Sequence, residues 1–468
     1  MSADRPNIVF FFTDDQRFDT IGALGNERVS TPNMDELVRR GTAFTHAHIP
    51  GGTSGAVCMP SRAMLHTGRT LFHIQGAGQS ISDDHLTLGE AFHRVGYRTF
   101  GAGKWHNGAE SYARSFTDGD EIFFGGMADH WNVPACHFDP TGRYEATRPI
   151  VDEPHRSNEV RQRRCDHVTA GTHSSELIAE AGIEFLRDYD DDAPLLMYLS
   201  FLAPHDPRTM PEEFRRMYDP QEVELPPNFM GGHPFDNGEL HIRDEMLAGF
   251  PRTPRETRRH IAEYYAMISH LDAQIGRVVE QLRAQDLLES TIVVLAGDNG
   301  LAVGRHGLFG KQNLYDHSVR VPLVFAGPGV PAGGRSEALV YLHDVLPTLC
   351  ELSGVKVPQT VEGRSLTGVL RNPGQGVRDA LYLAYTDKHR GVRRGGHKLI
   401  EYVVDGRHNM TQLFDLREDP WELNNLAADP SHADRLREMR AELTRMRDEW
   451  DDRDTTWGET FWAGYAPK

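Results

Sequence analysis

Acidic and amide side chains follow directly after two apolar runs of the chain. Asp14 and Asp15 follow residues 7–12, and Asp298 and Asn299 follow a second such run. The apolar runs predict buried strands, and α/β sheets bind ligands at the carboxyl ends of such strands. Both carboxylates of Asp14-Asp15 can face one ion only if the strand ends there, because neighbouring strand residues point to opposite faces. A solvated turn is the alternative interpretation of this pair.

Potentially cationic side chains follow other predicted strands. Lys104 and His106 come after a short strand over 98–102, and His205 comes after a strand over 195–202. Lys104 and His106 are two residues apart, so both can reach one anion from the same side. A surface loop is the alternative for that pair, and a hydrogen-bonded structural histidine is the alternative for His205.

Cys58 stands at the start of a predicted helix. The glycine-rich stretch 51–55 precedes it, and Pro60 suits the first helical turn. The N-terminus of a helix favours an anion, because its free amides and its dipole point toward the ligand. A buried, inert thiol is the alternative. No zinc-like spacing is present, so three further cysteines are predicted to be packing thiols: Cys136, Cys165 and Cys350.

The motif Cys58-Met59-Pro60-Ser61-Arg62, followed by Leu65-His66-Thr67-Gly68-Arg69, resembles the signature of the type I sulfatases of the alkaline phosphatase superfamily. The stretch 413–427 also resembles the closing segment of that family, so the resemblance covers nearly the whole chain. In this family a formylglycine-generating maturation enzyme oxidises the motif cysteine to an aldehyde. The resemblance therefore implies that Cys58 is the precursor of formylglycine, and that the hydrated aldehyde is the nucleophile.

The resemblance also assigns roles to the charged residues. It implies that one metal ion is held by Asp14, Asp15, Asp298, Asn299 and an oxygen of the modified Cys58. The family implies Ca²⁺, and an all-oxygen site of this kind suits Ca²⁺ or Mg²⁺ and not zinc. The resemblance assigns Arg62 as the cation at the hydrated aldehyde and His106 as the residue hydrogen-bonded to it. The cations that it assigns to the sulfate are Lys104, His205 and Lys311.

The expected reaction is transfer of a sulfuryl group from an alcohol to the hydrated aldehyde. Its charge is spread over oxygens, as in phosphoryl transfer, so fixed cations stabilise it. His205 or Lys311 is expected to protonate the departing alcohol. His106 is expected to remove a proton from the second hydroxyl of the hydrated aldehyde, so that sulfate leaves by elimination.

Two long irregular segments are predicted to determine the substrate specificity. Residues 107–164 read as a loop-rich insertion, and residues 218–254 resemble sulfatases that act on sulfated sugars. Asp236 and Arg243 in the second segment are candidates for binding sugar hydroxyls or a uronate. The alternative is that they are ordinary surface charges. A small sulfated carbohydrate is the predicted substrate.

Three other functions are weighed against this prediction. A formylglycine-dependent phosphonate monoester or phosphodiester hydrolase is the nearest, and Ser61 after Pro60 favours the sulfatase. A two-metal phosphatase is disfavoured, because the region where a second metal would be held is occupied by Lys104, His106, His205 and Lys311. A non-catalytic carbohydrate-binding relative is the alternative from a different class.

The elements around these residues predict an α/β fold. The apolar runs and the helical patterns over 174–189 and 256–284 predict helices on a sheet, and the resemblance implies a large mixed, mostly parallel sheet sandwiched by helices, as in alkaline phosphatase. The catalytic domain is expected to span 1–370. A smaller C-terminal α+β subdomain, with an antiparallel sheet and one helix over 433–450, is expected over 371–468.

The net charge of -18 argues against nucleic acid and against an anionic membrane surface as partners. The apolar run near the N-terminus is too short for a signal peptide or a membrane span. A cytoplasmic location is therefore expected, or a periplasmic or secreted one if a leader was removed. The sequence leaves the oligomeric state open.

Overall fold

The structure, a computed structural model, describes residues 5–151 and 158–467. An eight-stranded sheet forms its centre. The strand order across this sheet is β14 (Gly334–Ser336), β2 (Gly41–Phe44), β13 (Leu323–Ala326), β12 (Thr291–Gly297), β1 (Asn7–Thr13), β11 (Leu195–Ser200), β5 (Arg98–Lys104) and β6 (Asp118–Phe123). β13 runs antiparallel to both of its neighbours, and the other neighbouring pairs are parallel. The predicted mixed, mostly parallel sheet is confirmed.

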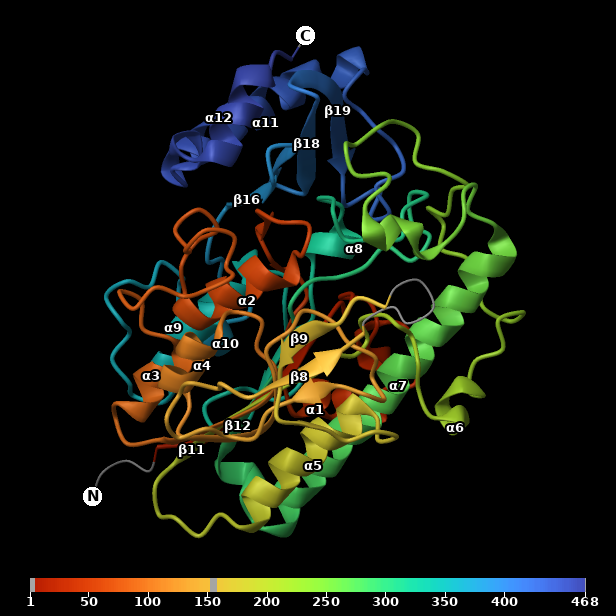
Figure 1. The fold of residues 1–468 in the computed structure, drawn as a ribbon. Helices are drawn as coiled ribbons and strands as arrows, with labels where there is room; N and C mark the ends of the chain where they lie inside the picture. Colours follow the sequence, from red (N-terminus) through yellow and green to blue (C-terminus); the bar gives the residue numbers. More distant parts are fainter. Residues whose placement is uncertain (1–4, 152–157, 468) are drawn as a thin grey trace.

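Helices cover both faces of this sheet, because its strands are apolar on both sides. In β1, Phe10 and Phe12 belong to one core, and Val9 and Phe11 belong to the other. The core with Val9 is covered by α1 (Pro32–Arg40), α5 (Ser174–Arg187) and α7 (Pro254–Ala284), of which α5 and α7 run side by side (Figure 1). The core with Phe10 is covered by α2 (Cys58–Thr67), α3 (Leu88–His93), α4 (Ala109–Ser115), α9 (Val345–Leu352) and α10 (Thr367–Arg371).

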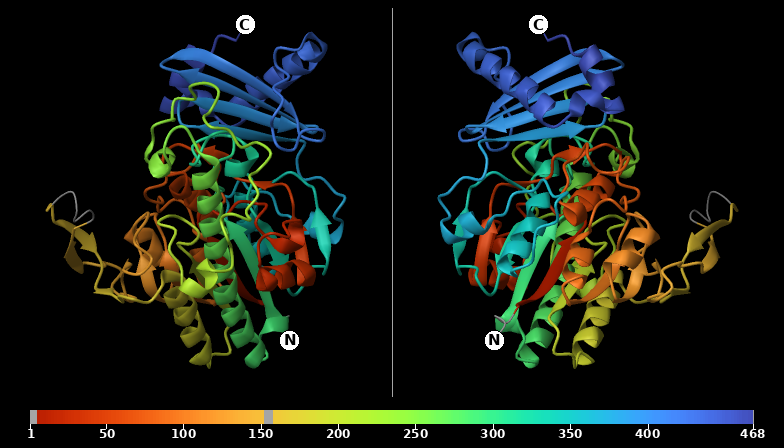
Figure 2. Two further views of the ribbon diagram at one scale, coloured as in Figure 1. Left: turned by 90° about the vertical axis from the view of Figure 1, so that its right-hand side faces the viewer. Right: turned by 90° about the vertical axis from the view of Figure 1, so that its left-hand side faces the viewer.

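The predicted loop-rich insertion contains more regular structure than its sequence suggests. β6 pairs with β5 and forms one edge of the central sheet, since Ile122 and Phe123 are buried. β7 (Pro134–Ala135) pairs with β10 (His167–Val168) beside it. β8 (Thr147–Ile150) and β9 (Arg161–Arg164) form a hairpin that projects from the body of the molecule (Figure 2). Residues 152–157 of the insertion lie outside the described residues.

The predicted antiparallel C-terminal sheet is also confirmed. It consists of β16 (Ala380–Tyr385), β17 (His389–Arg394), β18 (His397–Val404) and β19 (Arg407–Asp415). With α11 (Ala433–Glu449) and α12 (Thr456–Gly464) it covers one end of the molecule (Figure 2). A fifth strand, β4 (Gly51–Gly52), pairs with β16 and belongs to the segment that leads to Cys58.

Among residues 5–151 and 158–467, no helix is both long enough and apolar enough to span a membrane.

Candidate active site

The predicted site residues lie at one edge of the central sheet. The parallel strands end at matching positions, with Phe12 of β1 opposite Ser200 of β11, and Ser200 opposite Gly103 of β5. Side chains that follow these strands therefore meet although they are far apart in the sequence. Cys58, which is the first residue of α2, lies at the same edge of the sheet.

The acidic group is fully buried and tightly connected. Asp15 adopts a left-handed conformation with φ of 66°, which ends β1 and lets both aspartates face the site. The backbone N–H of Asp15 donates to Asp298 Oδ1 at 3.1 Å, and Asn299 Nδ2 donates to Asp15 Oδ1 at 2.6 Å. Ligand atoms of Asp14, Cys58 and Asp298 all lie within 4.8 Å of one another. The two predicted pairs of oxygen ligands are thus side by side.

Two buried lysines face these carboxylates. Lys104 donates to Asp14, and Lys311 donates to Asp15. His205 Nε2 lies 3.7 Å from Asp15 Oδ2. Burial alone would raise the pKa of Asp14, but Lys104, His205 and other nearby cations hold it well below its usual range. Asp14 is therefore a carboxylate at neutral pH.

The side chain of Cys58 lies between a cation and a base. Its Sγ is 3.4 Å from Lys104 Nζ and 3.4 Å from His106 Nδ1. Burial raises the pKa of the Cys58 thiol and outweighs the effect of the lysines. Burial, and then the charge of Lys104, lowers the pKa of His106 well below its usual value. An unmodified thiol would be a poor nucleophile here, whereas the neutral His106 can accept a proton.

Arg62 is held beneath the site by three acceptors. Its Nε donates to Asp298 Oδ2 at 2.9 Å, and its Nη1 donates to the backbone oxygen of Lys104 at 2.9 Å and to Ser200 Oγ at 2.6 Å. The guanidinium also lies over the ring of Phe12, 4.9 Å from its centroid. Ser200 was not predicted from the sequence, although its place at the end of β11 is the same signal that indicates the other residues.

The oxygen atoms at the site are suitable ligands for a hard metal ion. Asp14 Oδ1 and Asn299 Oδ1 are buried and have no hydrogen-bond partner among the described residues. An unpaired buried oxygen is costly unless a cation satisfies it. Carboxylate and amide oxygens are the ligands that Ca²⁺ and Mg²⁺ prefer. The residues that would hold such an ion are Asp14, Asp15, Asp298 and Asn299.

The two candidate sugar-binding residues lie in different surroundings. Arg243 donates to both carboxylate oxygens of Asp206, at 2.8 Å to Oδ1. His205 Nδ1 donates to the backbone oxygen of Asp206 at 2.8 Å, so Arg243 lies close to the site. Asp236 lies in an exposed turn, where its carboxylate accepts from the backbone N–H of Gly238 at 2.8 Å. Arg243 is thus connected to the site residues through Asp206. Asp236 lies in a separate exposed turn.

Comparison with known protein families gives two matches. The family described as "Sulfatase" matches residues 6–355, and the family described as "N-sulphoglucosamine sulphohydrolase, C-terminal" matches residues 304–449. The first match includes every residue that the sequence assigns to the site, from Asp14 to Lys311.

Similar proteins span almost the whole chain. An N-acetylglucosamine-6-O-sulfatase of Bacteroides thetaiotaomicron is 26% identical over 97% of this chain and 88% of its own length. An ulvan-active sulfatase of Formosa agariphila is 28% identical over 96% of this chain and 83% of its own length. Both alignments therefore include the segments that form the central sheet and the C-terminal sheet in this chain.

Solved structures share the fold. A structure described as a complex with its substrate D-glucosamine-2-N,6-O-disulfate has a TM-score of 0.78 at 23% identity, and covers 96% of this chain and 99% of its own. A phosphonate monoester hydrolase of Agrobacterium radiobacter has a TM-score of 0.73 at 21% identity, and covers 95% of this chain and 96% of its own.

Proposed function

Because the chain belongs to the sulfatase family, we propose that it removes sulfate from a small sulfated carbohydrate, using formylglycine made from Cys58 and a bound Ca²⁺. The observation that carries this proposal is the position of Cys58. It lies at the first turn of α2, within 3.4 Å of both Lys104 and His106, and beside the buried carboxylates of Asp14 and Asp298.

When present, hydrated formylglycine supplies an oxygen nucleophile and Ca²⁺ supplies positive charge at the sulfate. The chain's own residues do the remaining work. Lys104 and Lys311 supply ammonium groups at the oxygens where negative charge develops, and each preorganised donor of this kind contributes roughly 10²–10³ in rate. His106 accepts a proton from the group at position 58, and His205 or Lys311 protonates the departing alcohol. Arg62 fixes the floor of the site through Asp298 and Ser200.

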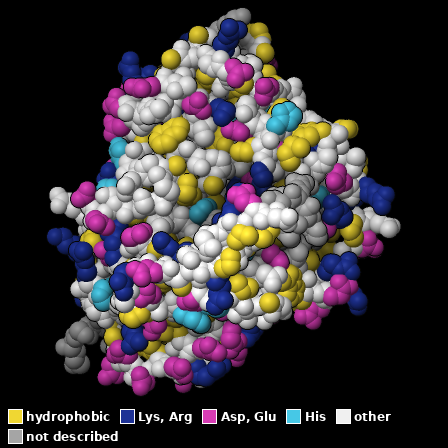
Figure 3. All heavy atoms as spheres, in the orientation of Figure 1, with side chains coloured by type: hydrophobic (Ala, Val, Ile, Leu, Met, Phe, Trp, Pro, Cys, Tyr) yellow, Lys and Arg dark blue, Asp and Glu magenta, His cyan; other side chains and the backbone are white. Residues whose placement is uncertain are grey.

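The carbohydrate substrate rests on the relatives and on the surface of this chain. Two of the relatives are named for N-acetylglucosamine and for ulvan. Acidic and basic side chains are interspersed on the face in Figure 3, and the net charge is -18. Such a surface offers a long polyanion little attraction, whereas the lysines of the site can still hold one sulfate group. A small sulfated sugar therefore suits the molecule.

A phosphonate monoester or phosphodiester hydrolase is the second candidate, because one such enzyme shares the fold. Parallel assays on aryl sulfate and aryl phosphonate esters separate the two. We expect the sulfate ester to be the better substrate. Preferential cleavage of the phosphonate would replace the proposal, and the absence of turnover on both classes would favour a binding protein.

Three experiments test the proposal. Mass spectrometry of the peptide around Cys58, from protein made together with the maturation enzyme, should show the aldehyde; an unmodified thiol in a fully active sample would refute the mechanism. A screen of defined sulfated mono- and disaccharides should identify the sugar and the sulfate position. Chelation of calcium should lower both turnover and the melting temperature. The reason is that removal of the ion leaves three buried carboxylates close together without its positive charge.

The structure also bears on the division of the chain. We propose a catalytic domain over 1–370 and a C-terminal subdomain over 371–468 that are joined by pairing of β4 with β16. This pairing places the end of the C-terminal sheet next to the segment that leads to Cys58.

A further inference from the structure

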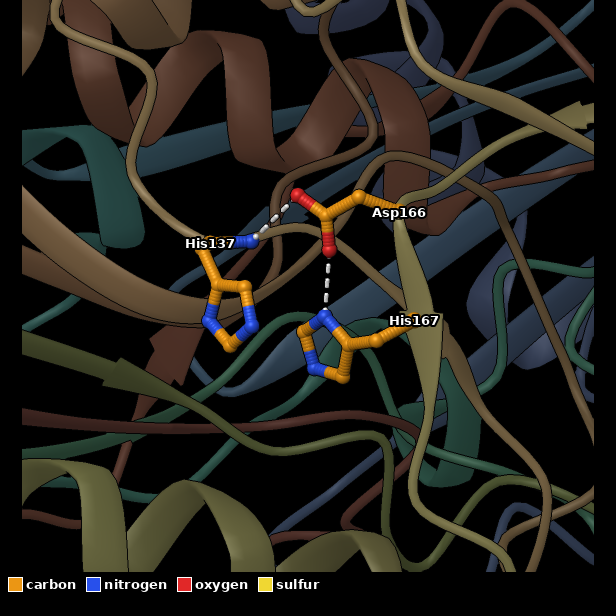
Figure 4. A group of neighbouring side chains, drawn as sticks. All are labelled: His137, Asp166 and His167. Carbon is orange, nitrogen blue, oxygen red and sulfur yellow. Dashed lines mark hydrogen bonds and ion pairs between the residues drawn. The ribbon is translucent and has the colours of Figure 1, made fainter.

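A second cluster of side chains of the kinds that bind metals lies outside the candidate active site. It is located where β7 and β10 meet the edge strand β6. Figure 4 shows the imidazoles of His137 and His167 facing each other, with the carboxylate of Asp166 beside them. The two ring centroids are 4.1 Å apart. One ligand atom from each of the three residues lies within 4.8 Å of the other two. The three side chains are therefore close enough to contact a single ion.

Each imidazole has a carboxylate of β6 on one of its two nitrogens. His137 Nδ1 donates to Asp120 Oδ1 at 2.7 Å, and His167 Nε2 lies 3.3 Å from Glu121 Oε2. The other two nitrogens are His137 Nε2 and His167 Nδ1. His167 Nδ1 hydrogen-bonds to Asp166 Oδ1, and an ion would replace this bond, while Asp166 Oδ2 accepts from the backbone N–H of His137 at 3.0 Å. Metal-bound histidines in proteins are oriented by a carboxylate on their second nitrogen in this way. The cluster thus has both the ligands and the groups that orient them.

We propose that His137, Asp166 and His167 bind a first-row divalent cation such as Zn²⁺. Two imidazole nitrogens and one carboxylate oxygen form a set that suits zinc and not calcium. On binding, the metal takes the lone pair of His167 Nδ1, and the imidazole keeps its single proton on Nε2, where Glu121 accepts it. Water completes the coordination, because the side chain of His137 is 65% exposed.

The surroundings of the cluster favour a cation. A hollow of about 390 Å³ beside it is lined by His137, by Arg98 and by six acidic residues, namely Asp118, Asp120, Glu184, Asp188, Asp190 and Asp191. Arg98 pairs with Asp118, so the lining keeps an excess of negative charge, which raises the local concentration of cations. The bound cation would join His137, which follows β7, to His167 of β10, and Asp120 and Glu121 would connect both imidazoles to β6. Its role is structural.

Calorimetric titration of the full chain with Zn²⁺, in excess Ca²⁺ to fill the oxygen site, tests this proposal. We expect one zinc site, with the affinity lowered about 10–100-fold by Asp120→Asn and more strongly by His167→Gln. His93→Gln, an exposed histidine of α3, is the matched control and should leave the affinity unchanged. Zinc should raise the melting temperature of the wild type and not that of His167→Gln.

Two results would overturn the proposal. One is a wild-type protein that binds no zinc, and the other is a zinc affinity that Asp120→Asn and His167→Gln leave unchanged. Circular dichroism without zinc checks that both variants are folded. Asp120 is partly exposed at the sheet edge, so Asp120→Asn decides the question even if His167→Gln does not fold. Zinc affinity is independent of turnover, so failure of the proposed sulfatase function would not affect this test.

Discussion

Burial sets the chemical state of each side chain at the candidate site. The carboxylates of Asp14 and Asp298 share the ammonium and guanidinium groups of Lys104 and Arg62, all within a volume closed to solvent. Charges in such surroundings interact strongly and cost no reorganisation during a reaction. The sequence indicated which residue types would meet at the strand ends. The position of Ser200 at the end of β11 carries the same signal, but a serine at a strand end is common, and only the tertiary structure shows its hydrogen bond to Arg62.

The two buried lysines give a prediction at this scale. Lys104→Ala and Lys311→Ala should each lower kcat about 10²–10³-fold on every sulfate ester, simple aryl sulfates included. The reason is that, in the proposed mechanism, each lysine supplies charge to the sulfate and not to the sugar. Steady-state kinetics on an aryl sulfate and on a sugar sulfate would measure this. Lys356→Ala, at an exposed position, is the control. If Lys104→Ala or Lys311→Ala lost activity on the sugar sulfate alone, the prediction would be contradicted.

Regular elements were predicted best where the hydrophobic pattern is long. The apolar stripe of α7 and the buried runs of β1, β11 and β12 appear in the sequence within a few residues of their observed bounds. β6 was missed because its alternating pattern contains Asp118, Gly119 and Asp120, which are typical of loops, and its pairing with β5 outweighs that local preference. The antiparallel direction of β13 depends on the chain path, which its own residues do not encode.

The position of Arg243 in the segment after α6 (Glu212–Arg215) gives the second prediction. Arg243 pairs with Asp206, which is next to His205, so Arg243→Ala should lower turnover on both an aryl sulfate and a sugar sulfate. Asp236→Ala should affect only the sugar sulfate, because Asp236 lies in an exposed turn. The two losses are read from kcat/KM on both substrates. An Arg243→Ala variant that loses only the sugar sulfate would instead show that this guanidinium reads the sugar directly.

At the scale of the whole molecule, the two sheets are joined where the chain approaches Cys58. Gly51 and Gly52 form β4 in the C-terminal sheet, and α2 begins six residues later with Cys58. Buried residues of the C-terminal sheet, such as Tyr382 and Leu399, belong to the same core as Phe10 of the central sheet. The sequence predicted a catalytic domain and a smaller C-terminal subdomain, and it could not indicate their shared core, because β4 is only two residues long. The C-terminal sheet therefore helps to position the segment that leads to Cys58.

Gly51 provides the test of this coupling. Its φ of +115° disfavours any side chain, and a Cβ at Gly51 would lie 2.1 Å from the backbone oxygen of Ala384 in β16. Gly25 has a φ of +113° with nothing within 4 Å of a Cβ, so Gly25→Ala carries the backbone strain alone, about 1–3 kcal/mol. Gly51→Ala should lower the free energy of unfolding by more than Gly25→Ala, and should also lower kcat, because β4 must move away from β16 and take the segment before Cys58 with it. Denaturant unfolding and aryl sulfate kinetics on both variants measure the two effects. Equal losses of stability, or a Gly51→Ala variant with unchanged kcat, would show that the C-terminal sheet does not position Cys58.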